Sequence, residues 1–285
     1  MSLRDLFSGP RPVCSFEVFP PKRDGDVASL YRTFEELAPL KPDYISVTYG
    51  AGGTNKGLHS EINAKLLELG ITPLAHFTCV GHSKDAIASQ LDALHALGVR
   101  NILALRGDPP QGAARFERPP DGFGHASELI HFIRSRWDFC LGAACYPEVH
   151  PEAASAQADL AALKLKADAG ADFFVTQMFF DNPSYFAFVK AARGAGVTQP
   201  IQPGILPVLS EKFFAREWGV RYPAGFKEGF AGAPPEAAET RGLDFAAAQC
   251  LGLLKEGAPG LHLYTMNKAR ASLAIHARLK DAGAL

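Results

Sequence analysis

Short apolar runs alternate with longer amphipathic stretches along the chain. Eight apolar runs have the length and the β-branched or aromatic content of buried strands; they cover residues 13–19, 43–50, 73–81, 101–107, 139–147, 172–180, 200–206 and 261–267. Helix-like spacing of apolar residues falls between them and predicts helices at 26–38, 60–69, 84–97, 125–136, 155–169, 183–194, about 235–256 and 267–281. Several predicted helices are followed by a glycine that can end them, namely Gly70, Gly98, Gly170 and Gly196.

The spacing of the predicted strands indicates one repeated unit. Most strand ends follow one another at about 30 residues, which is the length of a strand–helix unit. The interval from Ile205 to Tyr264 is much longer, and there we expect a pair of helices at 215–226 and 234–257. Eight consecutive units favour a closed (β/α)8 TIM barrel, formed as a single domain by residues 1–285, over a doubly wound open sheet.

Polar residues follow the predicted strands at their C-terminal ends, where barrel enzymes have their active sites. They are Glu17, Thr48, Tyr49, His76, Thr78, Arg106, Asp108, Tyr146, Glu148, His150, Gln177, Tyr264, Asn267 and Lys268. In the segment LALRGDPP (103–110), two charged residues follow the strand directly and two prolines then turn the chain outward. We therefore expect these side chains to meet at the mouth of the barrel.

Glu17 lies among apolar neighbours in the segment SFEVFPP (15–21). Burying a carboxylate costs several kcal/mol unless it is paired or protonated. Two interpretations follow: a carboxyl with a raised pKa that acts as a general acid, or a structural salt bridge to Arg106 across the barrel mouth. Asp108 could equally be a turn residue, and Gln177 could serve backbone groups. By themselves these residues do not name a reaction.

Composition excludes several classes of protein. The 29 Lys and Arg nearly balance the 30 Asp and Glu, so no nucleic-acid partner is expected. Neither a signal-peptide core nor an apolar run near the ~20 residues of a membrane span is present, and we expect a cytoplasmic protein without a membrane partner. The five cysteines form no CxxC pair and the nine histidines have no metal-binding spacing, which predicts reduced thiols and no metal ion.

Nucleotide-binding fingerprints do not match this chain. The segment GAGGTN (50–55) lacks the third glycine of the dinucleotide motif, and no phosphate-binding GxxxxGK[ST] motif occurs. A nucleotide would therefore bind through loops, helix N-termini and basic side chains, with Lys164 and Lys166 as candidates. A solvated helix face is the alternative for these two lysines.

Nine segments occur in a fixed order from residue 15 to residue 268. They are SFEVFPPK (15–22), VTYGAGG (47–53), LAHFTC (74–79), LALRGDPP (103–110), AACYPEVHPEA (143–153), AQADL (156–160), VTQMFFD (175–181), PGILPV (203–208) and HLYTMNK (262–268). This ordered set resembles the bacterial single-domain form of the 5,10-methylenetetrahydrofolate reductase family. The resemblance implies a TIM barrel that binds FAD non-covalently, accepts hydride from NADH or NADPH, and then reduces methylenetetrahydrofolate to 5-methyltetrahydrofolate in a ping-pong reaction. It also implies a homo-oligomer that serves one-carbon and methionine metabolism.

The resemblance further implies roles for individual residues. Glu17 matches the general acid, and Asp108 matches a carboxylate that lies between flavin and pterin. The matching substrate-binding positions are Gln177, Phe214, Tyr264 and Lys268. The matching FAD-binding positions are Thr48, Tyr49, Ala51, His76, Arg106, Gly107, Asp108, Ala126, Tyr146, His150, Ala153, Asp159 and Lys166. Many relatives carry Asn and Arg where this chain has Ala162 and Leu165, which predicts weaker retention of FAD.

Two other functions remain open from the sequence. A barrel lyase would use Glu17 with a lysine, but no lysine lies inside a predicted strand where a Schiff base would form. A pterin-binding protein without flavin would be expected to lack Glu17, Asp108 and Gln177, and this chain has all three. The colour of the purified protein separates these alternatives from the flavin-dependent reductase.

Overall fold

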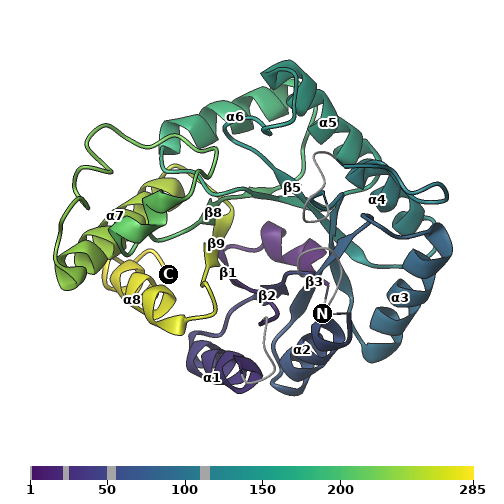
Figure 1. Cartoon of the computed structure of the whole chain (residues 1–285), viewed down its shortest axis with the longest axis horizontal. Coiled ribbons are helices and arrows are strands. Elements are labelled where there is room, and N and C mark those ends of the chain that lie inside the picture. Colours follow the sequence, from purple (N-terminus) through teal and green to yellow (C-terminus); the bar gives the residue numbers. More distant parts are fainter. Residues whose placement is uncertain (1, 22–25, 50–55, 110–115) are drawn as a thin grey trace.

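The structure is a computed structural model that describes residues 2–21, 26–49, 56–109 and 116–285. Its strands form a ring, and the α-helices surround that ring (Figure 1). The strands are β1 (Val13–Val18), β2 (Tyr44–Val47), β3 (Pro73–Thr78), β4 (Asn101–Leu105), β5 (Cys140–Cys145), β6 (Phe173–Thr176), β7 (Ile201–Gln202), β8 (Gly204–Ile205) and β9 (Gly260–Tyr264). The α-helices are α1 (Val27–Leu37), α2 (Lys56–Glu68), α3 (Lys84–Leu97), α4 (Ala126–Arg134), α5 (Ala156–Asp168), α6 (Asn182–Gly194), α7 (Pro235–Lys255) and α8 (Ala269–Asp281). Short 3-10 helices are η1 (Leu3–Ser8), η3 (Ala38–Leu40) and η5 (Glu211–Ala215).

Neighbouring strands pair in parallel, in the order β7-β6-β5-β4-β3-β2-β1-β9-β8. The two strands at the ends of this order, β7 and β8, are consecutive in the chain and separated by Pro203. Proline has no N–H to give to a ladder, so it splits the seventh predicted strand into two pieces. β7 pairs with β6, and β8 pairs with β9. The split strand thus closes the ring, and the predicted TIM barrel is confirmed.

The helices begin and end where the sequence supplies caps. The Ser83 and Ser155 hydroxyls accept hydrogen bonds from the first turns of α3 and α5, and the Asp181 carboxylate does the same for α6. Gly98 ends α3 with a φ of 102°, a left-handed conformation that glycine adopts without strain. The three other glycines predicted to follow helices also have positive φ values, so these predicted helix ends are confirmed.

Two apolar layers stabilise the barrel. The larger layer lies between the strands and the helices. The smaller layer lies inside the ring near the starts of the strands, where Leu3 packs with Tyr44, Leu103 and Phe173. Leu3 belongs to η1, the purple helix inside the ring in Figure 1, and its N–H donates to Asn101 Oδ1 at 2.9 Å. η1 therefore plugs the N-terminal end of the barrel and leaves the opposite mouth for ligands.

The segment between β8 and α7 differs from the predicted pair of helices. Residues 211–215 form η5, and turns lead from there to α7. Gly219, Gly225 and Gly232 have φ values of 68°, 73° and 62°, and no α-helix continues through such residues. The aromatic residues of this segment instead pack against one another and against Phe180. The first predicted helix is therefore wrong, and the second is confirmed as α7.

Candidate functional site

Strands β1, β2, β3 and β9 bring one carboxylate and two imidazoles together inside the barrel. His76 Nε2 and His262 Nε2 each lie 3.3 Å from Glu17 Oε2. The Ser46 hydroxyl donates to the same oxygen at 3.2 Å. The Glu17 side chain keeps 18% of its surface exposed, whereas the His262 side chain keeps 1%. Glu17 is thus a carboxylate at the edge of a buried polar cluster.

The neighbours of Glu17 decide its charge. Burial raises the pKa of the carboxyl, but the charge of His76 and the hydrogen bonds of both imidazoles outweigh burial and lower the pKa from 4.5 to about 2. The expected raised pKa is therefore wrong. The alternative salt bridge with Arg106 is also wrong, because Arg106 pairs with Glu152 and two imidazoles lie beside Glu17.

His262 and Ser46 are functional candidates that the sequence analysis did not identify. Both occupy alternate positions of apolar strands, Ser46 with Thr48 and His262 with Tyr264. Side chains two residues apart in a strand point to the same face. This alternation indicates that Ser46 and His262 face the same side of their strands as Thr48 and Tyr264. It does not indicate which polar residues meet across the barrel.

Arg106 and Gly107 follow β4 at the mouth. The Arg106 guanidinium donates two hydrogen bonds to the Glu152 carboxylate, at 2.6 and 3.0 Å, and lies 4.8 Å from the centre of the Phe116 ring. Gly107 has a φ of 91°, and a Cβ atom there would lie 2.6 Å from Val80 Cγ1. Asp108 follows with an exposed side chain. The Arg106 guanidinium and the Asp108 carboxylate thus lie on either side of Gly107, a position that has no room for a side chain.

The loop after β5 is held to α5 by polar contacts. Asp159 Oδ2 accepts a hydrogen bond from the His150 N–H at 3.0 Å, and the His150 ring packs edge-on against Tyr146 with centroids 4.5 Å apart. Lys166 Nζ donates to the Ala144 carbonyl at 2.5 Å. Burial lowers the pKa of the Lys166 ammonium. Four of the predicted FAD-binding residues, Tyr146, His150, Asp159 and Lys166, therefore belong to one connected region.

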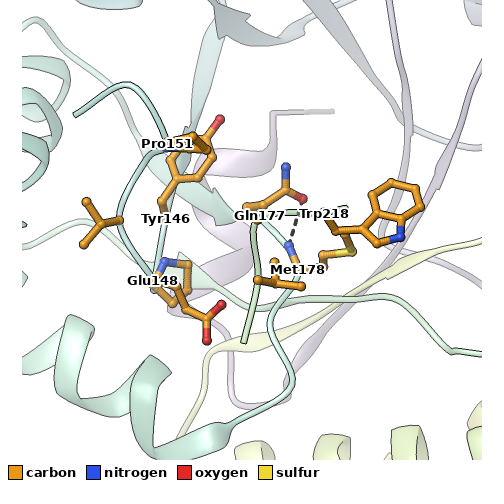
Figure 2. Close-up of a pocket in the computed structure, with 10 residues that line it drawn as sticks. Tyr146, Glu148, Pro151, Gln177, Met178 and Trp218 are labelled. Carbon is orange, nitrogen blue, oxygen red and sulfur yellow. Dashed lines mark hydrogen bonds between the residues drawn. The ribbon is translucent and has the colours of Figure 1, made fainter. Parts of the chain in front are cut away.

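A pocket lies beside this loop (Figure 2). Its lining includes Tyr146, Glu148, Gln177, Met178 and Trp218. The carbonyl oxygen of the Gln177 side chain accepts a hydrogen bond from the Met178 N–H at 2.9 Å, so the amide NH2 group is the end that a ligand would meet. The Glu148 carboxylate, 7% exposed, accepts from the Arg221 N–H at 2.8 Å. The pocket therefore joins a polar amide to an aromatic wall.

Trp218, rather than Phe214, supplies the aromatic wall of this pocket. Phe214 lies instead in the aromatic cluster of the 211–230 segment, with ring centroids 5.3 Å from Tyr222 and 5.5 Å from Phe230. Trp218 stacks on Phe213 at 5.1 Å and donates its Nε1–H to the Phe213 carbonyl. The tryptophan was not identified from the sequence because the path of this segment depends on its turns.

The other predicted substrate residues occupy the ends of β9 and α8. The Tyr264 hydroxyl donates to the Thr176 carbonyl at 2.8 Å, which ties β9 to β6. Burial raises the pKa of that hydroxyl well above 10. Lys268 precedes the first residue of α8 and its side chain is exposed. Tyr264 thus already has a partner within the barrel, whereas Lys268 is open to solvent at the rim.

The remaining predicted cofactor positions fall into three groups. Thr48 ends the β2 region at the mouth, and its N–H donates to the Val18 carbonyl. The Tyr49 ring packs away from the mouth against His59, Phe77 and His82. Ala126 is the first residue of α4 and Ala153 precedes α5, so both lie near helix N-termini. Ala51 lies outside the described residues.

Two features are absent from the described residues. No helix there is long and apolar enough to cross a membrane. No group of three or more His, Cys, Asp or Glu side chains there could hold a metal ion. The five cysteines are unpaired, and four of them are buried.

A TIM barrel with a charged and aromatic C-terminal mouth has the architecture of the barrel enzymes. The family model described as methylenetetrahydrofolate reductase matches residues 3–280. The chain therefore belongs to the methylenetetrahydrofolate reductase family, whose members are oxidoreductases of folate one-carbon metabolism. Sequence identity with individual relatives supports the same assignment.

Two relatives and one solved structure illustrate the similarity. The 5,10-methylenetetrahydrofolate reductase of Escherichia coli is 40% identical over 268 residues, which cover 92% of this chain and 88% of the relative. Methylenetetrahydrofolate reductase (NADH) 1 of Arabidopsis thaliana is 36% identical over 281 residues, and this chain spans about half of its length. A solved structure of an uncharacterized protein from Clostridium thermocellum has a TM-score of 0.68 with 14% identity and covers 99% of both chains. This last similarity concerns the fold alone.

Proposed function

We propose that the chain is a flavin-dependent methylenetetrahydrofolate reductase that uses NADH or NADPH in a ping-pong reaction. The observation that carries this proposal is Glu17, held by two imidazoles at the mouth of a barrel of this family. Opening the five-membered ring of the folate requires a proton on the departing nitrogen, and a carboxyl at hydrogen-bond distance can supply it. The plant relative is named for NADH, but this chain offers no feature that selects NADH over NADPH.

The residues around Arg106 and α5 fit FAD. Arg106 and Lys166 provide two cations for a diphosphate, and Asp159 can accept from a ribose hydroxyl. The Glu152 carboxylate accepts two hydrogen bonds from the Arg106 guanidinium. A phosphate group can accept the same pair of hydrogen bonds in its place. When bound, the cofactor supplies the capacity to accept hydride from the nicotinamide and to pass it to the folate.

Glu17 acts as the proton donor only after its surroundings change. Its low pKa keeps the carboxylate ionised at neutral pH. A folate that covers the exposed part of Glu17 removes water from the carboxylate, and this loss of solvation raises its pKa. The carboxyl then holds a proton within reach of the leaving nitrogen. This sequence of events makes the acid available in the folate half of the reaction.

Other residues bind and orient the substrate in this proposal. Asp108 hydrogen-bonds the pterin and stabilises the positive charge that develops on the folate. The Gln177 amide NH2 group donates to the bound ligand from the pocket. Phe214, Tyr264 and Lys268 contribute to the remaining substrate surface, with Lys268 placed at the rim for a carboxylate.

The test compares the two half-reactions in Glu17→Gln. Purified protein is expected to be yellow, and its flavin band should bleach on addition of NADH or NADPH. In Glu17→Gln, reduction of the flavin should proceed as in wild type, because it needs no proton from Glu17. Transfer from reduced flavin to methylenetetrahydrofolate should fall about 100-fold or more, as expected for loss of a general acid. Glu68→Gln, at an exposed ion pair with Lys65 on α2, is the matched control.

Three results would contradict the proposal in different ways. Equal loss in both half-reactions would give Glu17 a role other than proton donor. Full folate reduction in Glu17→Gln would remove Glu17 from catalysis. A colourless protein that binds 5-methyltetrahydrofolate but takes up no FAD would favour a folate-binding barrel without flavin. The last outcome is the second candidate because the Clostridium thermocellum barrel is described as binding two copies of 5-methyl-5,6,7,8-tetrahydrofolic acid.

A further inference from the structure

The turn after β9 contains a polar residue, Asn267, to which the proposed reaction gives no role. Met266 and Asn267 are consecutive residues with positive φ values, 51° and 58°. This left-handed conformation is unfavourable for residues with a side chain, although asparagine tolerates it better than most. Strained backbone persists only where surrounding contacts hold it, and it is concentrated at functional sites. The contacts of Asn267 should therefore show which part of the molecule the turn supports.

The Asn267 side chain forms two hydrogen bonds with the backbone of Phe19. The Phe19 N–H donates to Asn267 Oδ1 at 2.9 Å, and Asn267 Nδ2 donates to the Phe19 carbonyl oxygen at 2.7 Å. A backbone N–H only donates and a carbonyl oxygen only accepts, so one orientation of the amide makes both bonds and the reverse orientation makes neither. The amide thus supplies both the acceptor and the donor that a neighbouring strand would otherwise supply.

These bonds extend the pairing of β1 with β9 beyond the ladder itself. Past the ladder, the Thr265 N–H donates to the Glu17 carbonyl oxygen at 3.2 Å. The Thr265 hydroxyl donates to the same oxygen at 2.6 Å and accepts from the Asn267 N–H at 3.0 Å. Towards β2, the Thr48 N–H donates to the Val18 carbonyl oxygen at 3.0 Å. The end of β1 is therefore held by backbone on the β2 side and largely by side chains on the β9 side.

Glu17 lies two residues before Phe19, so the segment that Asn267 holds is the one that carries the carboxylate. Pro20 and Pro21 follow Phe19 and have no N–H with which to add another bond. We propose that Asn267 is a positioning residue that fixes the end of β1 and so keeps the Glu17 carboxylate in place for proton transfer. Asn267 acts through the backbone of Phe19 and through Thr265. This inference rests on the proposed function, because it concerns the proton donor of that reaction.

The two properties of Asn267 can be separated by substitution. Glycine adopts a φ of 58° without strain but has no side chain to bond Phe19. Alanine also lacks the amide, and its Cβ makes the left-handed conformation unfavourable. Asn267→Gly therefore removes the bonds to Phe19 alone, whereas Asn267→Ala removes the bonds and adds strain.

The test compares the two half-reactions in these full-length variants. The folate half-reaction at saturating folate should fall about tenfold or more in both, because a small misplacement of a catalytic group is costly. Reduction of the flavin by NADH should proceed as in wild type, since it needs no proton from Glu17. Asn267→Ala should unfold at a lower urea concentration than Asn267→Gly. The loss of folate reduction should therefore be shared by two variants of different stability.

Asn101 is the matched control at the opposite end of the barrel. Its Oδ1 accepts from the Leu3 N–H at 2.9 Å, and its Nδ2 donates to the Pro73 carbonyl oxygen at 3.2 Å. Asn101→Ala thus removes the same kind of paired backbone contact from the end that η1 plugs. This variant should unfold at a lower urea concentration than wild type and keep both half-reactions unchanged.

Hydrogen exchange measures the contact with Phe19 without any activity. In flavin-free protein labelled with 15N phenylalanine, the Phe19 N–H should exchange about tenfold faster or more in Asn267→Gly than in wild type. Phe19→Leu assigns the signal. The Phe174 N–H of β6 donates to the Pro200 carbonyl oxygen at 2.8 Å, and its exchange should be the same in both proteins.

The outcomes separate this inference from the proposed function. A wild-type folate half-reaction in Asn267→Gly, a loss of both half-reactions there, or an unchanged exchange rate of the Phe19 N–H would overturn the role of Asn267. An equal loss of folate reduction in Asn101→Ala would do the same, because the effect would then follow stability. Asn267→Gly keeps the test decisive if Asn267→Ala does not fold. Failure of the proposed function would appear instead in Glu17→Gln, as an unchanged folate half-reaction.

Discussion

Gly107 is the position where a small change should disturb the mouth most strongly. Its φ of 91° lies in the region that favours glycine, and it joins Arg106 to Asp108. A Cβ atom at Gly107 would lie 2.6 Å from Val80 Cγ1, 2.9 Å from Val80 Cβ and 3.1 Å from Thr78 Cβ. Val80 is 6% exposed and Thr78 is 8% exposed, so neither side chain has open space to move into. Gly107→Ala must therefore shift the backbone that carries the two charged residues.

The cost of Gly107→Ala has two parts. An L-residue in the left-handed region costs about 1–2 kcal/mol. Forcing an extra carbon into a packed site costs about 1–3 kcal/mol. The free energy of unfolding should therefore fall by roughly 2–5 kcal/mol. Retention of FAD should fall as well, because the displaced backbone carries Arg106.

Urea denaturation followed by circular dichroism measures this prediction, on protein stripped of flavin so that cofactor binding does not add to stability. Gly194→Ala is the matched control. Gly194 is the last residue of α6, and a Cβ atom there would meet no heavy atom within 4 Å. The control should change stability by less than about 1 kcal/mol, in the stabilising direction. A Gly107→Ala protein within about 0.5 kcal/mol of wild type that also retains FAD would refute the steric argument.

Three other predictions address the acid, the plug and the cofactor. The lowered pKa of Glu17 makes its ionisation stabilising above pH 4.5, and this contribution of about 3 kcal/mol is lost as pH falls from 4.5 through about 2. Between pH 6 and pH 3, the free energy of unfolding in urea should therefore fall by about 2 kcal/mol less in Glu17→Gln than in wild type. Equal declines in the two proteins would contradict the lowered pKa. Leu3→Ala should lower the free energy of unfolding by about 2–5 kcal/mol because Leu3 is 0% exposed inside the barrel; a thermal melt like that of wild type would show that η1 does not plug it. The double variant Leu165→Arg with Ala162→Asn should lose FAD more slowly on dilution, since Leu165 is 60% exposed on α5 next to Lys166. An unchanged rate of FAD release would contradict the prediction that Ala162 and Leu165 weaken FAD binding.

Most of the barrel could be predicted because its elements depend on local pattern. Short apolar runs bounded by glycine or proline give the strands, and capped amphipathic stretches give the helices. The seventh strand was predicted as one element, whereas Pro203 splits it into β7 and β8. The failed helix at 215–226 has a similar cause, because positive φ at Gly219 and Gly225 overrides an amphipathic pattern.

The partners of Glu17 could not be predicted in the same way. Its strand neighbours β2 and β9 come from distant parts of the sequence. His76 was identified from the sequence as a position for FAD, and the structure places it beside Glu17. His262 and Gln202 come together only because the split strand closes the ring between β6 and β9. A pattern of alternating residues gives the face on which a side chain lies, but the closure of the barrel decides what it meets.

The low pKa of Glu17 and its proposed role as a general acid both depend on two opposing effects on its pKa. Burial raises the pKa, and the imidazoles lower it by a larger amount. The imidazole contribution is anchored in the barrel, since His262 is held through Ser15 and Gln202. Solvation of the carboxylate is the part that a ligand can change, because 18% of the Glu17 side chain is exposed at the mouth. A ligand that covers this surface increases only the desolvation of the carboxylate, which raises its pKa. Binding of the folate therefore favours the protonated form of Glu17, which can donate a proton.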